Sequence, residues 1–287
     1  MKTAVITDTN SGITEDAAKA LGVFTVSMPV IIDEETYYEG KSLTEETFFQ
    51  ALKDGHHIST SQPSPGDVME LWDHVLSMGY DEIVYIPMSS ALSHSCEAAM
   101  AFAQDYDGKV QVVDNHRLSV PMKESVLHAK ELSDQGHSAK EIREILDADG
   151  TNCNVYVTVT TLEQLKKGGR ITPAAAMLGS LLSIHPILTI QSGRVDSFAK
   201  ARGSIAKCEA KMIEAVKSDL ATRFAGQDMT KLHIGAAGAG LSPEEQHAWT
   251  SMIQESFPEV SVYYDPLPIS LICHCGPGAV GIGVCFH

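Results

Sequence analysis

Hydroxyl side chains gather in the segment "ISTSQPSP" (58–65), directly before a predicted amphipathic helix. Ser64 and Pro65 make an ordinary helix start, because Ser is a favoured N-cap and Pro suits the first helical position. Thr60 and Ser61 lie outside that helix, in a stretch that a proline keeps extended. A surface loop rich in Ser and Thr is the simpler explanation of this segment when it is taken alone.

The arrangement recurs in "SSALSHS" (89–95), which follows a predicted strand at 81–88. Ser93 or a neighbour is expected to cap the next helix, and more hydroxyl groups lie beside it than one cap requires, including that of Ser95. In a parallel sheet both strand-to-helix turns lie at the carboxyl edge, where ligands bind. Two helix starts with spare hydroxyl groups predict a site for a small anionic group, such as a carboxylate or a phosphate.

Two more polar side chains lie beside glycine-rich turns. In "KKGGR", Arg170 comes directly after two glycines, which let the backbone turn sharply and approach a ligand closely. The same pattern is also typical of a helix C-cap followed by a solvated Arg. His274 precedes a Gly-Pro-Gly turn in what we predict to be the last strands, where a single His is more often a core residue than a ligand.

The segment Cys273-His274-Cys275 is the one that suggests metal ligation. Three neighbours in an extended segment alternate between faces, so they cannot close one tetrahedral site. No C-x-x-C pair completes such a site, and six cysteines in a chain of this length do not make a disulfide framework. We therefore expect no metal, and we expect the thiols to be reduced and buried.

The composition restricts the classes of partner. The 287-residue chain has a formal net charge of −16 and is 44% hydrophobic, as expected of a globular protein with a sizeable core. Nucleic acids and anionic membrane surfaces need clustered Lys and Arg, which such a charge disfavours. No segment approaches the ~18 continuous apolar residues of a membrane span, and no secretory signal is evident. We expect a cytoplasmic protein with no nucleic-acid partner and no stable membrane insertion.

The first half of the chain alternates strand-like and helical patterns. Strands are predicted at 3–8, 23–32, 81–88 and 109–114. Helices are predicted at 14–22, 44–55, 122–136 and 138–150, and after each hydroxyl-rich segment. Such alternation predicts an α/β domain, residues 1–150, that has a parallel sheet with helices on both faces.

After residue 150 the pattern changes. A strand at 152–161, a helix ending at a Gly pair, an apolar helix from Thr172 and a hairpin at 185–199 come first. A helix from about 203 to 224, a strand at 231–238, a helix starting at Ser242 and three β-like runs follow. We interpret residues 151–287 as a second α/β domain with a mixed sheet and helices.

Seven motifs in order along the chain carry a family resemblance. They are "VITDTNSGI" (5–13), "TSQPSP" (60–65), "SSALSHS" (89–95), "KKGGRI" (166–171), "HPIL" (185–188), "KARG" (200–203) and "HCGPGAVGIG" (274–283). Together they resemble the DegV family over essentially the whole sequence. Members of that family are bacterial two-domain proteins that bind a long-chain fatty acid. Some present its carboxylate to a separate fatty-acid kinase, which makes an acyl phosphate for phospholipid synthesis.

The resemblance implies roles for particular residues. The carboxylate is expected between the two domains, with the hydroxyl groups of the first domain as its hydrogen-bond donors, namely those of Thr60, Ser61, Ser93 and Ser95. Arg170 and His274 are expected in the network behind it. The acyl chain is expected in a tunnel of the second domain, lined by "AAAMLGSLLSI" (174–184) and the closing Gly-rich strands. Lys200 and Arg202 match a basic surface motif that the family links to kinase docking. No cofactor and no catalysis by the chain itself are implied.

The sequence also departs from the family pattern. Ser93-His94-Ser95 stands where Ser-Gly-Thr is usual, so His94 restricts the backbone and adds a titratable group beside the hydroxyl groups. The segment "VVDNHRLSVPMKES" (112–125) replaces a Gly-rich helix start, and two thiols flank His274. We expect these departures to leave the fold intact.

Two enzyme classes remain as alternatives. "HIGAAGAGLSPEEQ" (233–246) places a Gly-rich turn between a strand and a helix, as in nucleotide binders, but its spacing is G-x-x-G-x-G. A hydrolase could use one of the many Ser residues, but the G-x-S-x-G elbow is missing. Asp8 after the first strand suggests an aspartyl nucleophile, but "DTN" lacks the second acid of such phosphatases.

Overall fold

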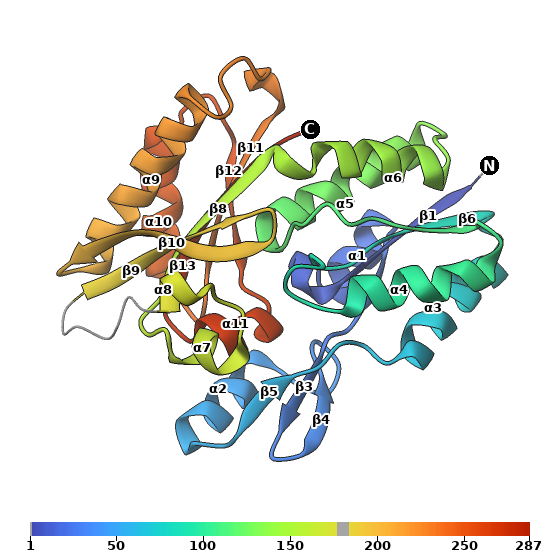
Figure 1. Ribbon diagram of the computed structural model, residues 1–287, viewed down its shortest axis with the longest axis horizontal. Coiled ribbons are helices and arrows are strands. Elements are labelled where there is room, and N and C mark those ends of the chain that lie inside the picture. Colours follow the sequence, from blue (N-terminus) through green and yellow to red (C-terminus); the bar gives the residue numbers. More distant parts are fainter. Residues whose placement is uncertain (1, 177–183) are drawn as a thin grey trace. The chain divides into compact units, whose positions relative to one another are not determined.

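The computed structural model describes residues 2–176 and 184–287, which form two compact units (Figure 1). Unit 1 runs to Leu118, continues over Met122–Gly150 and includes Pro268–Ser270. Unit 2 consists of Ser119–Pro121, Thr151–Leu267 and Leu271–His287. Two short segments therefore belong to a different unit from their neighbours in the sequence.

Unit 1 is built on a four-stranded parallel sheet in the order β2-β1-β6-β7. The strands are β1 (Thr3–Asp8), β2 (Phe24–Val26), β6 (Glu82–Ile86) and β7 (Val110–Val112). Successive side chains point to opposite faces, so Val5 and Val84 join one apolar cluster while Ile6 and Tyr85 join another. Both faces are buried, as a parallel sheet requires. The predicted parallel sheet with helices on both faces is confirmed.

Six helices of unit 1 carry the expected start signals or cover these faces. They are α1 (Glu15–Leu21), α2 (Glu45–Asp54), α3 (Pro65–Ser77), α4 (Ser95–Ala103), α5 (Ser119–Asp134) and α6 (Ala139–Ala148). Residues of α1, α5 and α6 belong to the cluster of Val5, and residues of α3 and α4 to that of Ile6. Thr44 and Thr47 form a capping box at α2, and Ser64 caps α3 by accepting from the Asp67 N–H at 3.0 Å.

The single strand predicted at 23–32 is wrong. The chain leaves the parallel sheet at Val26 and enters a second, antiparallel sheet of order β4-β3-β5. Its strands are β3 (Pro29–Ile32), β4 (Glu35–Tyr38) and β5 (Ile58–Thr60). The β3–β4 hairpin turns at Asp33 and Glu34, both at positive φ, and this pair lacks the glycine by which such turns are usually recognised.

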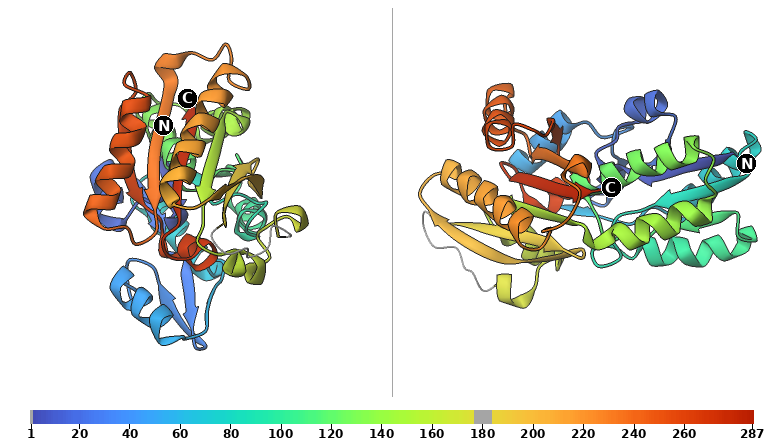
Figure 2. Two further views of the ribbon diagram at one scale, coloured as in Figure 1. Left: turned by 90° about the vertical axis from the view of Figure 1, so that its left-hand side faces the viewer. Right: turned by 90° about the horizontal axis from the view of Figure 1, so that it is seen from above.

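Unit 2 contains a six-stranded mixed sheet in the order β10-β9-β8-β13-β11-β12. The strands are β8 (Cys153–Thr158), β9 (Ile184–Gln191), β10 (Arg194–Arg202), β11 (Leu232–Gly238), β12 (Val262–Pro266) and β13 (Val280–Phe286). Only the β11–β12 pair is parallel among these. The predicted hairpin is confirmed as β9–β10, the long yellow ribbon in Figure 2, with Ser192 and Gly193 at positive φ in its turn.

Helices α9 (Ile205–Ala221) and α10 (Pro243–Ser256) pack against one apolar face of this sheet. Trp249 of α10 is buried there and donates from its indole N–H to the Gly281 carbonyl at 2.9 Å. Ser242 and Glu245 form the capping box at the start of α10. The predicted helices at 203–224 and from Ser242 are thus confirmed.

The prediction of three closing β-like runs is wrong in its middle part. Residues Ile269–Cys275 form a helix, α11, between β12 and β13. A short apolar run such as "PISLIC" can be a strand or a buried helix turn, and periodicity alone does not separate them. Cys273, His274 and Cys275 therefore lie in a helix, and the extended geometry that we assumed for them was incorrect.

The other α-helices among the described residues of unit 2 are α7 (Glu163–Gly168) and α8 (Pro173–Ala176). The apolar helix predicted from Thr172, and most of the tunnel lining predicted at 174–184, continue into residues 177–183, which lie outside the described residues. Over the described part of the chain, every helix is too short or too polar to cross a membrane.

Candidate functional site

Asp8 hydrogen-bonds to two loops at the carboxyl edge of the parallel sheet. Its carboxylate accepts from the N–H of Met88, which follows β6, at 2.8 Å, and from the backbone and side chain of Asn10 at 2.9 and 2.8 Å. Complete burial raises the pKa of Asp8 to about 6, although these hydrogen bonds act to lower it. Both carboxylate oxygens are used within the protein, so Asp8 positions the loops rather than offering a nucleophile.

The first hydroxyl-rich segment is more ordered than a surface loop. Thr60 is the last residue of β5 and pairs with Val30 of β3, and the Ser61 N–H donates to the Pro29 carbonyl at 3.2 Å. Thr60 is half-buried and Ser61 is exposed. The strand thus fixes the backbone that carries both hydroxyl groups.

The second hydroxyl-rich segment forms the start of α4. The N-cap position is occupied by His94, which the prediction of a cap at Ser93 or a neighbour allows, but the His94 side chain makes no cap hydrogen bond. The Ser93 hydroxyl accepts from the Ser95 N–H at 3.2 Å, one residue inside the helix. Ser95 is only 7% exposed, and its hydroxyl has no hydrogen-bond partner among the described residues. A buried hydroxyl without a partner is unusual and points to a ligand.

His94 adopts a helical backbone, with φ −72° and ψ −1°, which any residue accepts. The glycine usual at this position is therefore not required by the backbone of this chain. The imidazole is highly exposed and lies 3.2 Å from the Glu97 carboxylate through Nδ1. It is engaged with Glu97 on the surface, which argues against its acting as a base toward the neighbouring serines.

A Ser, a His and an Asp also meet at this edge of the sheet. The His116 Nδ1 lies 3.4 Å from the Ser90 hydroxyl and 3.1 Å from the Asp114 carboxylate. A catalytic triad needs the two partners on different imidazole nitrogens, because one nitrogen takes the proton while the other is held by the acid. Both contacts here use Nδ1, so this trio does not have the geometry of a relay.

A buried network around Glu39 had no signal in the sequence. Glu39 Oε2 lies 2.8 Å from the Thr9 hydroxyl and 3.1 Å from the Ser270 hydroxyl, which is 231 positions away. The Ser270 hydroxyl also lies 2.8 Å from the Asn10 Oδ1, and it has only one proton to donate. Burial raises the pKa of Glu39, while the hydrogen bonds from Thr9, Ile269 and Ser270 act to lower it. This network holds the Pro268–Ser270 segment in unit 1.

In unit 2, the glycine pair at the end of α7, Gly168 and Gly169, lies beside Arg170 and His274. Gly169 is at φ +67° as the C-cap of α7, so the helix-ending interpretation of "KKGGR" is confirmed. The Arg170 guanidinium folds back and donates to the Gly168 carbonyl. A Cβ on Gly168 would lie 2.6 Å from the His274 Nδ1 and 3.8 Å from the Arg170 Cδ. Only a glycine lets the imidazole approach the backbone this closely.

The environment of His274 keeps its imidazole neutral. Burial, with a smaller contribution from the positive charge of Arg170, lowers the pKa of His274 from 6.5 to about 4. At neutral pH this side chain therefore has one N–H to donate and one nitrogen to accept.

We expect an NMR titration of the ligand-free protein to place the His274 imidazole midpoint well below 6.5, with a His274→Gln spectrum assigning the resonance. Because the unfolded chain binds this proton more tightly, His274 should lower the free energy of unfolding as the pH falls from 6.5 through about 4. A midpoint at or above 6.5 would contradict the buried geometry.

The Gly-rich turn after β11 is not open to a phosphate. A Cβ on Gly238 would lie 2.7 Å from the Leu241 Cγ and 2.9 Å from the Tyr264 hydroxyl, so side chains of the protein fill the space in front of it. A phosphate-binding turn needs that space for close approach of the ligand to the backbone. This packing disfavours the nucleotide-binding interpretation.

Lys200 and Arg202 are exposed on β10, which is an edge strand. A β-bulge between Ser197 and Ala199 shifts the register there. Because one extra residue reverses the alternation of side chains, Ala201 is buried against α9, and Lys200 and Arg202 point to the other face. The two cations are thus displayed side by side.

The sequence and the structure were compared with those of known proteins. A family model described as "Uncharacterised protein, DegV family" matches residues 2–287. A DegV domain-containing protein of Deinococcus radiodurans is 32% identical over 290 residues, covering 99% of this chain and 98% of that protein. A DegV family protein from Thermus thermophilus, described as binding fatty acid, has a TM-score of 0.86 at 29% identity. DegV of Bacillus subtilis, described as a fatty acid binding protein, has a TM-score of 0.84 at 27% identity. Both structural matches cover 100% of each chain.

Proposed function

The chain belongs to the DegV family, and from that premise we propose that it binds a long-chain fatty acid and presents the carboxylate to a partner fatty-acid kinase. The similar structures that are described as fatty-acid-binding proteins support the ligand class. The observation that carries the proposal for this chain is the buried hydroxyl of Ser95, which has no partner among the described residues.

The carboxylate is a suitable partner for that hydroxyl. A hydrogen bond to a charged group stabilises by about 1.5–3 kcal/mol, and an unsatisfied buried donor costs about 1–3 kcal/mol. Ser95 opens the nine-residue helix α4, whose N-terminal N–H groups and dipole also favour an anion. Thr60, Ser61 and Ser93 supply further hydroxyl groups in the proposed site, all from unit 1.

Unit 2 contributes Arg170 and His274 in this proposal. The guanidinium supplies positive charge, and the neutral imidazole can donate one hydrogen bond without adding a second cation. The acyl chain is proposed to bind in a tunnel of unit 2, residues 151–287, while unit 1 carries the head-group loops of residues 1–150. Each buried CH₂ contributes about 0.8 kcal/mol, so a full-length chain is held tightly until a partner releases it.

The proposed role is that of a carrier rather than an enzyme. The kinase transfers a phosphoryl group to the presented carboxylate, and the acyl phosphate enters phospholipid synthesis in a bacterial cytoplasm. Ser90 and Asp114 both contact the same nitrogen of His116, which argues against hydrolysis by this trio. Side chains fill the space in front of Gly238, which argues against nucleotide turnover. Both observations support a carrier. The bound fatty acid is the ligand, and no cofactor is proposed.

Mass spectrometry tests the ligand directly. The protein purified from cells is measured once under native conditions and once after denaturing extraction with solvent. We expect the native mass to exceed the chain mass by that of a fatty acid, and we expect the extract to contain the same acid. A protein that carries no lipid and takes up none when incubated with fatty acids would contradict the proposal.

Kinase docking gives a separate prediction for Arg202→Ala. We expect acyl-phosphate formation by a cognate kinase to fall about tenfold, a loss of about 1.4 kcal/mol in productive docking, while fatty-acid affinity stays unchanged. Arg194→Ala is the matched control, because Arg194 is an exposed Arg at the other end of the same strand. Equal effects of both changes, or a loss of fatty-acid affinity in Arg202→Ala, would remove the docking role.

A further inference from the structure

Two cysteines face each other across neighbouring strands of unit 2. Cys153 is the first residue of β8, and Cys285 is the last but one of β13. They are direct partners in the antiparallel register of these strands, and both are reduced and buried. Neither is one of the residues that the proposed fatty-acid site uses.

The backbone hydrogen bonds between β8 and β13 show whether Cys153 and Cys285 form a hydrogen-bonded or a non-hydrogen-bonded pair. The Phe286 N–H donates to the Asn152 carbonyl at 3.0 Å, so the next pair along, Cys285 and Cys153, is a non-hydrogen-bonded pair. The His287 N–H donates to the Lys231 carbonyl on the other side of β13, which agrees with this alternation. Cα atoms in such a pair lie about 4.5 Å apart with their side chains on the same face. A disulfide accepts Cα separations of about 4.4–6.8 Å, so this pair can be bridged with little backbone movement.

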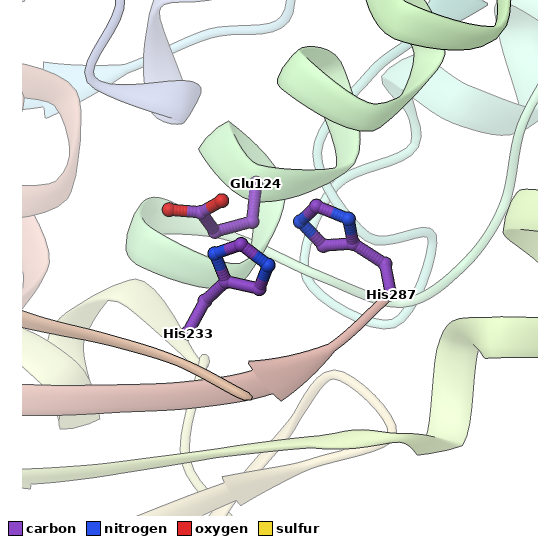
Figure 3. Close-up of side chains that lie close together, drawn as sticks. All are labelled: Glu124, His233 and His287. Atoms are coloured by element: carbon purple, nitrogen blue, oxygen red, sulfur yellow. The ribbon is translucent and has the colours of Figure 1, made fainter. Parts of the chain in front are cut away.

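Two stacked imidazoles, those of His233 and His287, lie next to the cysteine pair in the sheet. His233 of β11 is the register partner of Cys285, and its ring stacks on that of His287 with centroids 4.0 Å apart and planes 6° apart (Figure 3). Residues opposite each other in a sheet point to the same face, so His233 is directed to the side of the sheet that carries the two thiols. An imidazole beside a thiol can accept its proton, and the thiolate is the form that reacts with peroxides.

We propose that Cys153 and Cys285 form a reversible intramolecular disulfide when the protein meets a hydroperoxide. One thiolate attacks the peroxide oxygen to give a sulfenic acid and release water or an alcohol. The second thiolate then attacks the sulfenic sulfur, the S–S bond forms, and the sulfenic oxygen leaves as water. Hydrogen peroxide is the oxidant. A thiol reductant reverses the step by exchange.

The test uses the full chain treated with increasing hydrogen peroxide, with free thiols alkylated after denaturation and peptides mapped by mass spectrometry. We expect the number of alkylated cysteines to fall from six to four. We expect one linked peptide pair, Cys153 with Cys285, which disappears after reduction. Cys285→Ser should abolish the link. Cys208→Ser, which removes another fully buried thiol of unit 2, should leave it intact.

Three outcomes would overturn the proposal. They are alkylation of all six thiols after treatment, a link that instead joins the neighbouring Cys273 and Cys275 of α11, and irreversible sulfinic acid as the first product on Cys153 or Cys285. The decisive link is sought in the unaltered protein, so a variant that fails to fold does not remove the test. Fatty-acid content plays no part in this readout, so the test is independent of the proposed function.

Discussion

Replacing Ser95 with Ala should weaken fatty-acid binding by about 10- to 100-fold while leaving the ligand-free protein as stable as before or slightly more stable. The reason is that the Ser95 hydroxyl is buried and makes no hydrogen bond with the described residues. Removing it costs the apo protein nothing and deprives the carboxylate of a donor. Titration with a labelled fatty acid gives the affinity, and denaturant unfolding of delipidated protein gives the stability.

Ser64→Ala is the matched control for this change. Ser64 is an exposed Ser at the start of the neighbouring helix α3, and its hydroxyl is used as an N-cap. Its loss should lower the free energy of unfolding by about 1 kcal/mol and leave fatty-acid affinity unchanged. The proposed head-group site is wrong if Ser95→Ala binds as tightly as the unaltered protein, or if it loses stability as Ser64→Ala does.

Gly168→Ala should also reduce fatty-acid affinity at least about tenfold, through His274. The added methyl group would lie 2.6 Å from the imidazole Nδ1, closer than real contacts allow, so the ring must move. Moved out of its buried position, His274 should titrate nearer to its ordinary pKa of 6.5 than to about 4. The helix itself is not harmed, because Ala is a better helix former than Gly at the last residue of α7.

Gly169→Ala separates this effect from backbone strain. Gly169 is at φ +67° with open space where a Cβ would lie, so Ala there costs about 1–2 kcal/mol of stability without touching His274. We expect its His274 titration and its fatty-acid affinity to match those of the unaltered protein. If Gly168→Ala leaves both the midpoint and the affinity unchanged, then the contact between Gly168 and His274 has no role in binding.

Local signals in the sequence predicted local structure well. The helix starts at Thr44 and Ser242, the Ser-Pro start of α3 and the strand-helix alternation of residues 1–150 all rest on interactions within a few residues. The same holds for the glycine end of α7. Such interactions are encoded by neighbouring side chains, so reading them from the sequence needs no knowledge of the packing.

Features that depend on distant parts of the chain could not be predicted in this way. The break between Val26 and Pro29 and the helix α11 lie in short apolar runs, whose form is decided by what packs against them. The Glu39–Ser270 contact and the approach of Gly168 to His274 join positions that no pattern relates.

The candidate site was therefore only partly accessible from the sequence. Thr60, Ser61, Ser93 and Ser95 were chosen because they exceed what capping needs. That argument expected Ser93 or a neighbour to cap α4 without saying which, and the structure has His94 at the N-cap position. It also could not identify Ser95 as the hydroxyl without a partner, since that depends on burial. Their role as carboxylate ligands remains a prediction.

The most direct test of the central claim compares one long-chain fatty acid with its methyl ester on delipidated protein. The two ligands have the same acyl chain, so burial of CH₂ groups contributes equally, and only the acid offers a carboxylate to the hydroxyl groups. Our account predicts that the acid binds at least about tenfold more tightly than the ester, because hydrogen bonds to a charged group are the stronger ones. Equal affinity for the two ligands, or no binding of either, would contradict it.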